Sequence, residues 1–342
     1  MKKHNFVILF VLLSSLMPLS GKATKFSTVK NSSTTIANVL NKKGDKQPSG
    51  DTKPNKADKN KSKFTGEFTT DFTAKNGLIY VNAELNGKPA SFVLDSGLGS
   101  DLILNSNSKL LEDLKESDVC ISGMGSGKCR QIETSWVSTF NWKGIMVSDV
   151  DVVAMPLSNL GGNDNFAGII GFNMFKNYQL TFDYQHHNLK VSTNKNLEKE
   201  IKENGKLLST IPFEMKEHMP VFDVEINGKT YKMGLDTGAS VNVINIKYFD
   251  GFTNSLTKIQ EVSMKGFGGE SKVKRGSIKE TRIGGLTYDN MDYNFENASL
   301  NNLNKEYKYG IDGLIGYDFL KKYITVVDFN SKEIRIYEGS KN

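Results

Sequence analysis

Two short stretches of the chain place an aspartate in the same local pattern. An apolar run leads into Asp95-Ser96-Gly97, and a second apolar run leads into Asp236-Thr237-Gly238. Taken singly, such triplets are common in turns. Two carboxyl groups held about 3 Å apart share a proton, however, and such a pair can activate a water molecule. The matched triplets therefore predict paired carboxylate chemistry, with Asp95 and Asp236 as the candidate catalytic residues.

The two triplets belong to a longer internal repeat. The matching segments are 84–88 with 225–229, 168–172 with 313–317, and 175–191 with 320–336. Asn-Gly within the first pair of segments predicts a tight β-hairpin, because both turn residues need positive φ. Two long copies indicate one supersecondary unit used twice, since a solenoid needs at least three repeats.

Alternation of apolar and polar residues predicts short strands throughout the repeat, from Leu78 onward. Helical signals are brief, over 173–178 and 318–323, and a polar helix or linker is expected over 198–204. Many short strands with glycine turns favour an all-β fold. The division that we predict is a signal peptide over 1–23, a disordered basic linker or prosegment over 24–63, lobes over 64–195 and 207–342, and an inter-lobe linker over 196–206.

The motifs resemble those of the aspartic peptidase family, in its retroviral-type and pepsin-like forms. Each lobe of that family carries Asp-Thr/Ser-Gly, a glycine-rich flap hairpin, and two hydrophobic residues followed by Gly. The matching flap and Gly motifs here are Gly123–Gly127 with Ile169-Ile170-Gly171, and Gly266–Gly269 with Leu314-Ile315-Gly316. The resemblance implies a bilobed acid-protease fold, with two homologous β-barrel-like lobes and an active-site cleft between them. It also implies an endopeptidase without a cofactor that acts on a peptide or protein substrate.

The resemblance also implies roles for neighbouring residues. Ser96 and Thr237 would brace the two active-site loops, and Gly97 and Gly238 would let backbone N–H groups approach the carboxylates. The residues expected at the flap tips, where they would contact either substrate or each other, are Met124, Gly125, Phe267 and Gly268.

The first motif departs from the family pattern at Leu98 and Gly99. Leu98 would either crowd the aspartates or face the core. An alternative function is therefore a peptide-binding protein of this fold with impaired catalysis, and a further possibility is a homodimer. Because Leu98 and Ala239 lack the hydroxyl that would lower a carboxyl pKa, we expect a pH optimum at about 4–6.

The N-terminus has the features of an export signal: basic residues, an apolar run over 6–19, and small residues before Thr24. We therefore expect a periplasmic or secreted protein with no stable membrane insertion after cleavage. The first 63 residues hold 13 Lys and 3 Asp, which gives this segment a charge of +10. Because the net charge of the whole chain is +6, the remaining residues carry −4. Because the basic excess lies in a tail, nucleic-acid binding is excluded.

Cys120 and Cys129 flank the first glycine-rich turn. If that turn is a flap hairpin, the two sulfur atoms can face each other, and export favours a disulfide over two buried thiols. No HExxH motif or other metal-ligand pattern is present, so we expect no metal site. Two lobes in one chain make a monomer the expected state.

Overall fold

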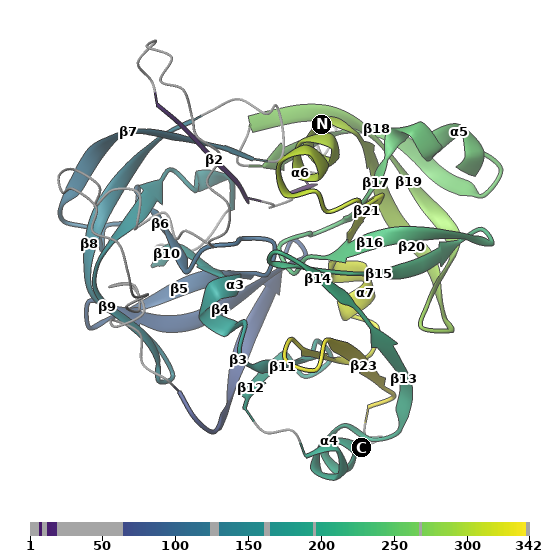
Figure 1. Cartoon of the computed structure of the whole chain (residues 1–342), viewed down its shortest axis with the longest axis horizontal. Helices are drawn as coiled ribbons and strands as arrows, with labels where there is room; N and C mark the ends of the chain where they lie inside the picture. The colour runs from purple at the N-terminus through teal and green to yellow at the C-terminus, as the bar shows by residue number, and fades with distance from the viewer. Residues whose placement is uncertain are drawn as a thin grey trace, which may run out of the picture.

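The computed structural model describes residues 7–8, 12–18, 64–123, 130–160, 165–193, 196–266 and 269–339. Figure 1 shows two β-rich lobes side by side, with a further sheet that joins them. The strands form two extended hydrogen-bonded sheets. The all-β, bilobed architecture predicted from the sequence is therefore confirmed.

The elements of the first half are strands with two short helical turns. They are β3 (Glu67–Lys75), β4 (Leu78–Leu85), β5 (Lys88–Asp95), β6 (Leu102–Asn105), β7 (Leu114–Gly123), β8 (Arg130–Trp142), β9 (Ile145–Met155), η1 (Ser158–Leu160), β10 (Phe166–Gly171), α3 (Phe172–Phe175), β11 (Gln179–Asp183) and β12 (Asn188–Ser192).

The second half repeats this order after the linking helix α4 (Leu197–Asn204). Its elements are β13 (Leu207–Pro212), β14 (Glu214–Lys216), β15 (Met219–Ile226), β16 (Lys229–Leu235), β17 (Asn242–Asn245), η2 (Ile246–Tyr248), α5 (Phe249–Phe252), β18 (Leu256–Gly266), β19 (Gly269–Ile283), β20 (Leu286–Glu296), α6 (Ala298–Tyr307), β21 (Gly313–Ile315), α7 (Tyr317–Leu320), β22 (Ile324–Asp328) and β23 (Glu333–Tyr337).

The two predicted hairpins lead directly into the aspartates. β4 and β5 turn at Asn86 and Gly87, whose φ angles are 50° and 75°. β15 and β16 turn at Asn227 and Gly228, whose φ angles are 50° and 72°. Two consecutive positive φ angles define the tight turn expected from Asn-Gly.

A buried strand crosses beside each aspartate-bearing strand. β10 runs parallel to β5 and antiparallel to β6, and β21 is placed in the same way between β16 and β17. β10 ends at Gly171, and Gly316 directly follows β21, so a glycine of the predicted motifs lies at the end of each crossing strand. A Cβ at Gly171 would lie 2.3 Å from the Ser100 carbonyl oxygen, and one at Gly316 would lie 2.1 Å from that of Ala239. Only glycine fits here, which accounts for the motif physically.

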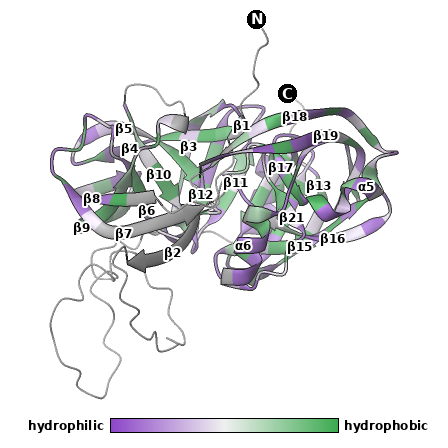
Figure 2. Cartoon of the chain, turned by 90° about the horizontal axis from the view of Figure 1, so that it is seen from above, coloured by the Kyte–Doolittle hydropathy of each residue, from purple (hydrophilic) through white to green (hydrophobic). Residues whose placement is uncertain are grey.

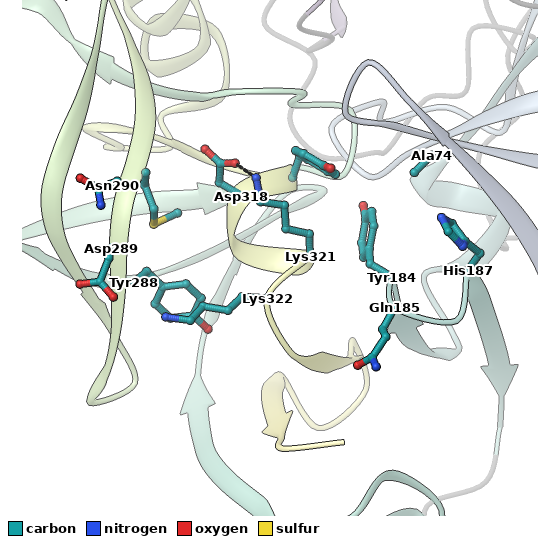
Figure 3. A pocket seen from close by; sticks show the side chains of 12 residues that line it. Ala74, Tyr184, Gln185, His187, Tyr288, Asp289, Asn290, Asp318, Lys321 and Lys322 are labelled. Atoms are coloured by element: carbon teal, nitrogen blue, oxygen red, sulfur yellow. Dashed lines mark hydrogen bonds and ion pairs between the residues drawn. The ribbon is translucent and has the colours of Figure 1, made fainter. Parts of the chain in front are cut away.

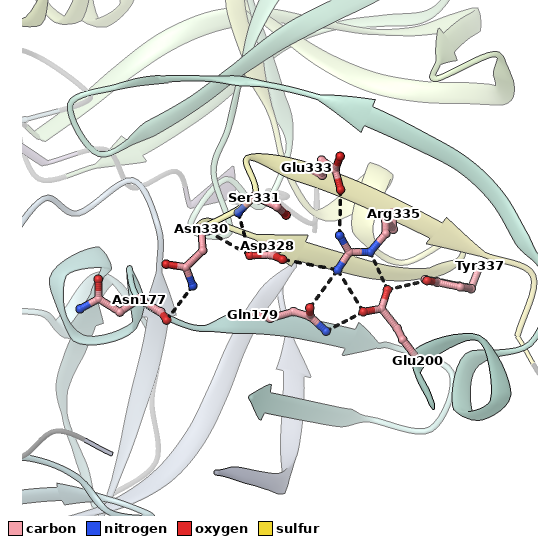
Figure 4. Close-up of polar contacts among 9 residues, drawn as sticks. All are labelled: Asn177, Gln179, Glu200, Asp328, Asn330, Ser331, Glu333, Arg335 and Tyr337. Atoms are coloured by element: carbon pink, nitrogen blue, oxygen red, sulfur yellow. Dashed lines mark hydrogen bonds and ion pairs between the residues drawn. The ribbon is translucent and has the colours of Figure 1, made fainter. Parts of the chain in front are cut away.

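The halves are joined by six strands in the order β13-β23-β22-β11-β12-β3, three from each half. A buried polar network fastens α4 to this sheet (Figure 4). The guanidinium of Arg335 donates to both carboxylate oxygens of Glu200, over 2.7 and 3.0 Å, and to Gln179 over 2.8 Å. Tyr337 also donates to Glu200, and Arg335 lies 3.7 Å from Asp328. These partners satisfy a buried charge pair that would otherwise be destabilising.

Each lobe has an apolar interior. Green and purple residues alternate along many strands in Figure 2, as expected for strands with one face on a core and one on solvent. The crossing strands differ, because all six residues of β10 are buried. One large cluster of buried side chains extends through both halves, one smaller cluster lies within the first half, and two lie within the second.

The N-terminal apolar run contributes two strands, β1 (Val7–Ile8) and β2 (Leu12–Pro18). β1 pairs with β18, and β2 pairs with β7. Among the described residues, we find no helix of the length and apolarity that a membrane crossing requires. Export, signal cleavage and the behaviour of residues 24–63 remain predictions.

Candidate active site

Asp95 and Asp236 occupy equivalent places in the two halves. Asp95 is the last residue of β5, and Asp236 directly follows β16. Both side chains are completely buried. The amide of Gly97 donates to Asp95 Oδ1 over 2.8 Å, and the amide of Gly238 donates to Asp236 Oδ1 over the same distance. The repeat thus delivers two carboxyl groups in matched geometry.

The two aspartate loops are bound to each other. The Ser96 amide donates to Thr237 Oγ1 over 2.9 Å, and the Thr237 amide donates to Ser96 Oγ over 2.9 Å. Thr237 Oγ1 in turn donates to the Leu94 carbonyl oxygen over 3.0 Å. All of these groups are buried, where a hydrogen bond is strong and an unmade one is costly. This exchange fixes the separation of the loops.

The glycines show how closely each loop approaches the opposite carboxyl group. A Cβ at Gly97 would lie 2.7 Å from the carboxyl of Asp236, and one at Gly238 would lie 2.6 Å from the carboxyl of Asp95. Real Cβ atoms do not approach other atoms that closely, so both positions require glycine. The structure thereby brings together the six loop and dyad residues named from the sequence.

Burial and mutual repulsion dominate the electrostatics of the pair. The pKa of Asp95 is raised well above its usual range, first by burial and then by the charge of Asp236. Burial also raises the pKa of Asp236, against the effect of the Gly238 amide. The Oδ2 atoms of both residues are buried and accept no hydrogen bond from an N–H or hydroxyl among the described residues. The pair can therefore hold one proton near neutral pH, leaving one acid and one base.

Leu98 does not crowd the aspartates. Its side chain is buried in an apolar cluster of the first half with Val93, Ile103 and Ile169. It also points toward Gly171, where a Cβ would lie 2.8 Å from Leu98 Cγ. The departure at this position therefore serves core packing.

The four expected flap-tip residues lie outside the described residues, as does Cys129. The strands that lead to those tips are described: β7 pairs with β8, and β18 pairs with β19. Cys120 lies on β7. The contact of the tips with substrate and the disulfide therefore stay predictions.

Sequence reasoning missed one residue that touches the site. His218 precedes β15 in the second half, yet its Nε2 lies 2.9 Å from the carbonyl oxygen of Gly97 in the first half. A signal was present in the repeat, because His218 aligns with Gly77 at the offset of 141 residues that relates Asp95 to Asp236. The other two histidines of the predicted mature chain lie in the turn after β11 and are exposed.

A cavity of about 630 Å³ lies away from the aspartates, between β20, α7 and the turn after β11 (Figure 3). Tyr184, Tyr288 and two lysines contribute to its walls. Both lysines are engaged: Lys321 pairs with Asp318, and Lys322 donates to a backbone carbonyl. Within the described part of the chain, no group of three or more His, Cys, Asp or Glu side chains is arranged to hold a metal ion.

A duplicated β fold with a completely buried aspartate on a matched loop of each half defines a two-lobed aspartic peptidase architecture. Residues 81–174 and 222–319, one segment in each half, match the aspartyl protease family. The matched segments cover more than half of the chain, which therefore belongs to that family. Among solved structures, the chain is similar to an aspartic proteinase from Irpex lacteus, with a TM-score of 0.50 and 12% identity, over 80% of this chain and 98% of that chain. That likeness concerns the fold alone, and no curated protein matches the chain.

Proposed function

We propose that the protein is an exported aspartic endopeptidase that hydrolyses peptide bonds with a water molecule activated between Asp95 and Asp236. The observation that supports this most is the matched pair of buried carboxyls on loops tied together by reciprocal hydrogen bonds. Such an arrangement holds two titrating groups with one proton between them, as the reaction requires.

The proposed steps use that single proton. The ionised aspartate accepts a proton from the bound water, whose oxygen attacks the carbonyl carbon of the peptide bond. The protonated aspartate donates to the carbonyl oxygen, and a proton then passes to the leaving nitrogen as the C–N bond breaks. Because the two carboxyls titrate as one unit, the roles of acid and base are assigned to the pair.

An extended peptide suits the strand edges beside the site. β7 and β18 lead to the two glycine-rich turns, and their edges already accept β2 and β1 as neighbours. A substrate strand can pair with such edges through its own backbone groups. We propose that the substrate is bound in this way by a monomer, and that the chain is exported before it acts.

The alternative, a peptide-binding protein with impaired catalysis, depended on Leu98 and Gly99. Leu98 packs into the core, and the space left by Gly99 is taken by the His218 ring, so neither departure disturbs the dyad. The peptidase is therefore the function that the geometry supports best.

The test is peptidase activity of residues 24–342 on a mixed peptide library, from about pH 3 to 7. We expect cleavage by the wild type, with none by Asp95→Asn or Asp236→Asn. Loss with Asp236→Asn alone would point to dimers built on the second half. If neither the wild type nor a version lacking residues 24–63 cleaves any peptide, the peptide-binding alternative would be favoured instead.

A further inference from the structure

His218 connects the second half of the chain to the aspartate loop of the first. Its ring is buried, with 7% of the residue exposed. Nε2 lies 2.9 Å from the Gly97 carbonyl oxygen. A carbonyl oxygen only accepts hydrogen bonds, so Nε2 carries the proton and donates it. The ring therefore acts as a fixed donor from one half to the backbone of the other.

The bonded carbonyl belongs to a peptide unit that also faces the dyad. The N–H of Leu98, on the other side of the Gly97–Leu98 peptide bond, donates to the main-chain carbonyl oxygen of Asp95 over 3.4 Å and also lowers the pKa of the Asp95 carboxyl. The N–H of Gly97 donates to Asp95 and also lowers the pKa of Asp236. Restraining this one carbonyl therefore holds the Gly97–Leu98 peptide unit directly, and through the Gly97 Cα it restrains the neighbouring unit whose N–H donates to Asp95.

The repeat shows that the contact is specific to one side. Displaced by the 141 residues that separate the aspartates, His218 matches Gly77, and Gly99 matches Ser240. In one of these two contacts between the halves, Gly77 packs against Ser240, and a Cβ at Gly77 would lie 2.7 Å from the Ser240 carbonyl oxygen. On the other side the sizes are exchanged: a Cβ at Gly99 would lie 2.6 Å from Nδ1 of His218. The imidazole of His218 thus fills the space that a side chain at position 99 would occupy.

The surroundings of the ring hold it in one orientation and one charge state. The Tyr309 hydroxyl lies 3.2 Å from each ring nitrogen, and with Nε2 protonated it can donate to Nδ1. The rings of Tyr307 and Tyr309 meet the imidazole edge-on, with centroids 5.4 and 5.8 Å away. Burial lowers the pKa of His218 to about 4, so the neutral donor form predominates above that pH.

We propose that His218 is a positioning residue of the dyad: by donating to the Gly97 carbonyl it fixes the peptide units that orient Asp95 and Asp236. The inference rests on the proposed peptidase function. It differs from a packing role, because it requires the hydrogen bond and not only a ring that fills the space at Gly99.

The first test compares His218→Gln with His218→Leu in the full chain, with a peptide chosen from the library as substrate. Glutamine keeps an N–H at a similar reach, whereas leucine keeps bulk without a donor. We expect leucine to lower kcat about tenfold or more with little change in KM, because small displacements of reacting groups are costly. Glutamine should recover most of that loss. Equal kcat in wild type and His218→Leu would overturn the inference.

A second variant separates the bond from packing. The pair Gly99→Ser with His218→Gly reproduces the Gly77–Ser240 contact of the other side. We expect it to restore the Tm that Gly99→Ser alone reduces, while kcat stays as low as in His218→Leu. Recovery of kcat along with Tm would show that filling the space is enough, and would overturn the positioning role.

A readout without catalysis distinguishes failure of this inference from failure of the proposed function. In ¹H–¹⁵N spectra of the full chain, a buried and bonded Nε2–H of His218 should exchange slowly, unlike those of the exposed His186 and His187. If the wild type is inactive but shows this slow exchange, the peptidase proposal and the expected effect on kcat are refuted. The hydrogen bond from His218 to the Gly97 carbonyl would still be supported. An active wild type with fast exchange at His218 would refute the restraint alone.

Discussion

Replacing Asp236 with asparagine is expected to stabilise the folded protein at neutral pH and to leave its stability at pH 4 nearly unchanged. Burial raises the pKa of Asp236 from 3.8 to about 7 in the folded state. The folded pair therefore keeps a proton that the unfolded chain releases above pH 4. When the pKa of a carboxyl is higher in the folded than in the unfolded state, the free energy of unfolding falls as the pH increases from the unfolded pKa to the folded pKa. Asparagine does not titrate, so this loss disappears.

The size of the effect follows from the shift. A change of roughly 3 pH units corresponds to about 4 kcal/mol at 1.36 kcal/mol per unit, and this is the upper limit. Asp95 shares the proton, so one substitution removes on the order of half of it, about 2 kcal/mol near pH 7.5. At pH 4, close to the unfolded pKa of Asp236, little of this loss has accumulated, and the variant should lie within about 0.5 kcal/mol of wild type.

Urea unfolding of the full chain at pH 4.0 and pH 7.5 measures the difference. Asp289→Asn is the matched control, because that carboxylate is exposed on β20 and should give the same small change at both pH values. Equal stability gains at the two pH values, or a loss for Asp236→Asn at pH 7.5, would refute the burial argument. The assay needs no substrate, so it examines the dyad independently of the proposed reaction.

Three further substitutions examine the surroundings of the site. Gly238→Ala places a Cβ 2.6 Å from the opposing carboxyl and should lower kcat about 100-fold, whereas Gly251→Ala, which meets open space, should leave it unchanged. Ser96→Ala removes the acceptor of a buried amide in the opposing loop, and urea unfolding should show a loss of about 1–3 kcal/mol. Arg335→Met leaves the Glu200 carboxylate buried without its cation, for a loss of about 3–5 kcal/mol in the same assay. Replacing Glu200 by Leu as well should recover most of that loss, and no recovery would contradict the charge-burial explanation.

The parts of the structure that could be predicted are those determined by residues close together in the sequence. The Asn-Gly turns need two positive φ angles that few other residue pairs adopt, so both hairpins were visible in the sequence. The dyad was visible because a short triplet recurs at a matched place in a duplicated frame. The glycines at 171 and 316 were visible as motif residues, and the structure supplies the close backbone contacts that require them.

Other parts could not be predicted because they depend on partners far away in the sequence. The antiparallel pairing of β11 with β22 joins the halves, but apolar alternation identifies a strand without identifying its neighbour. α6 escaped notice because Asn-rich sequences have low helix propensity. Its helix depends instead on burying Leu300 and Leu303 in the core of the second half.

The departures from the internal repeat are as informative as the matches. When the first motif is compared with the family pattern alone, Gly99 is only an unexplained departure. Compared with the other half of this chain, it is one member of an exchanged pair, because His218 takes the space that a side chain at 99 would fill. A duplicated protein can change such a pair only in both halves together, since either change alone leaves a clash or a void. Paired departures at the repeat offset therefore locate contacts between the halves, and here they locate one beside the dyad.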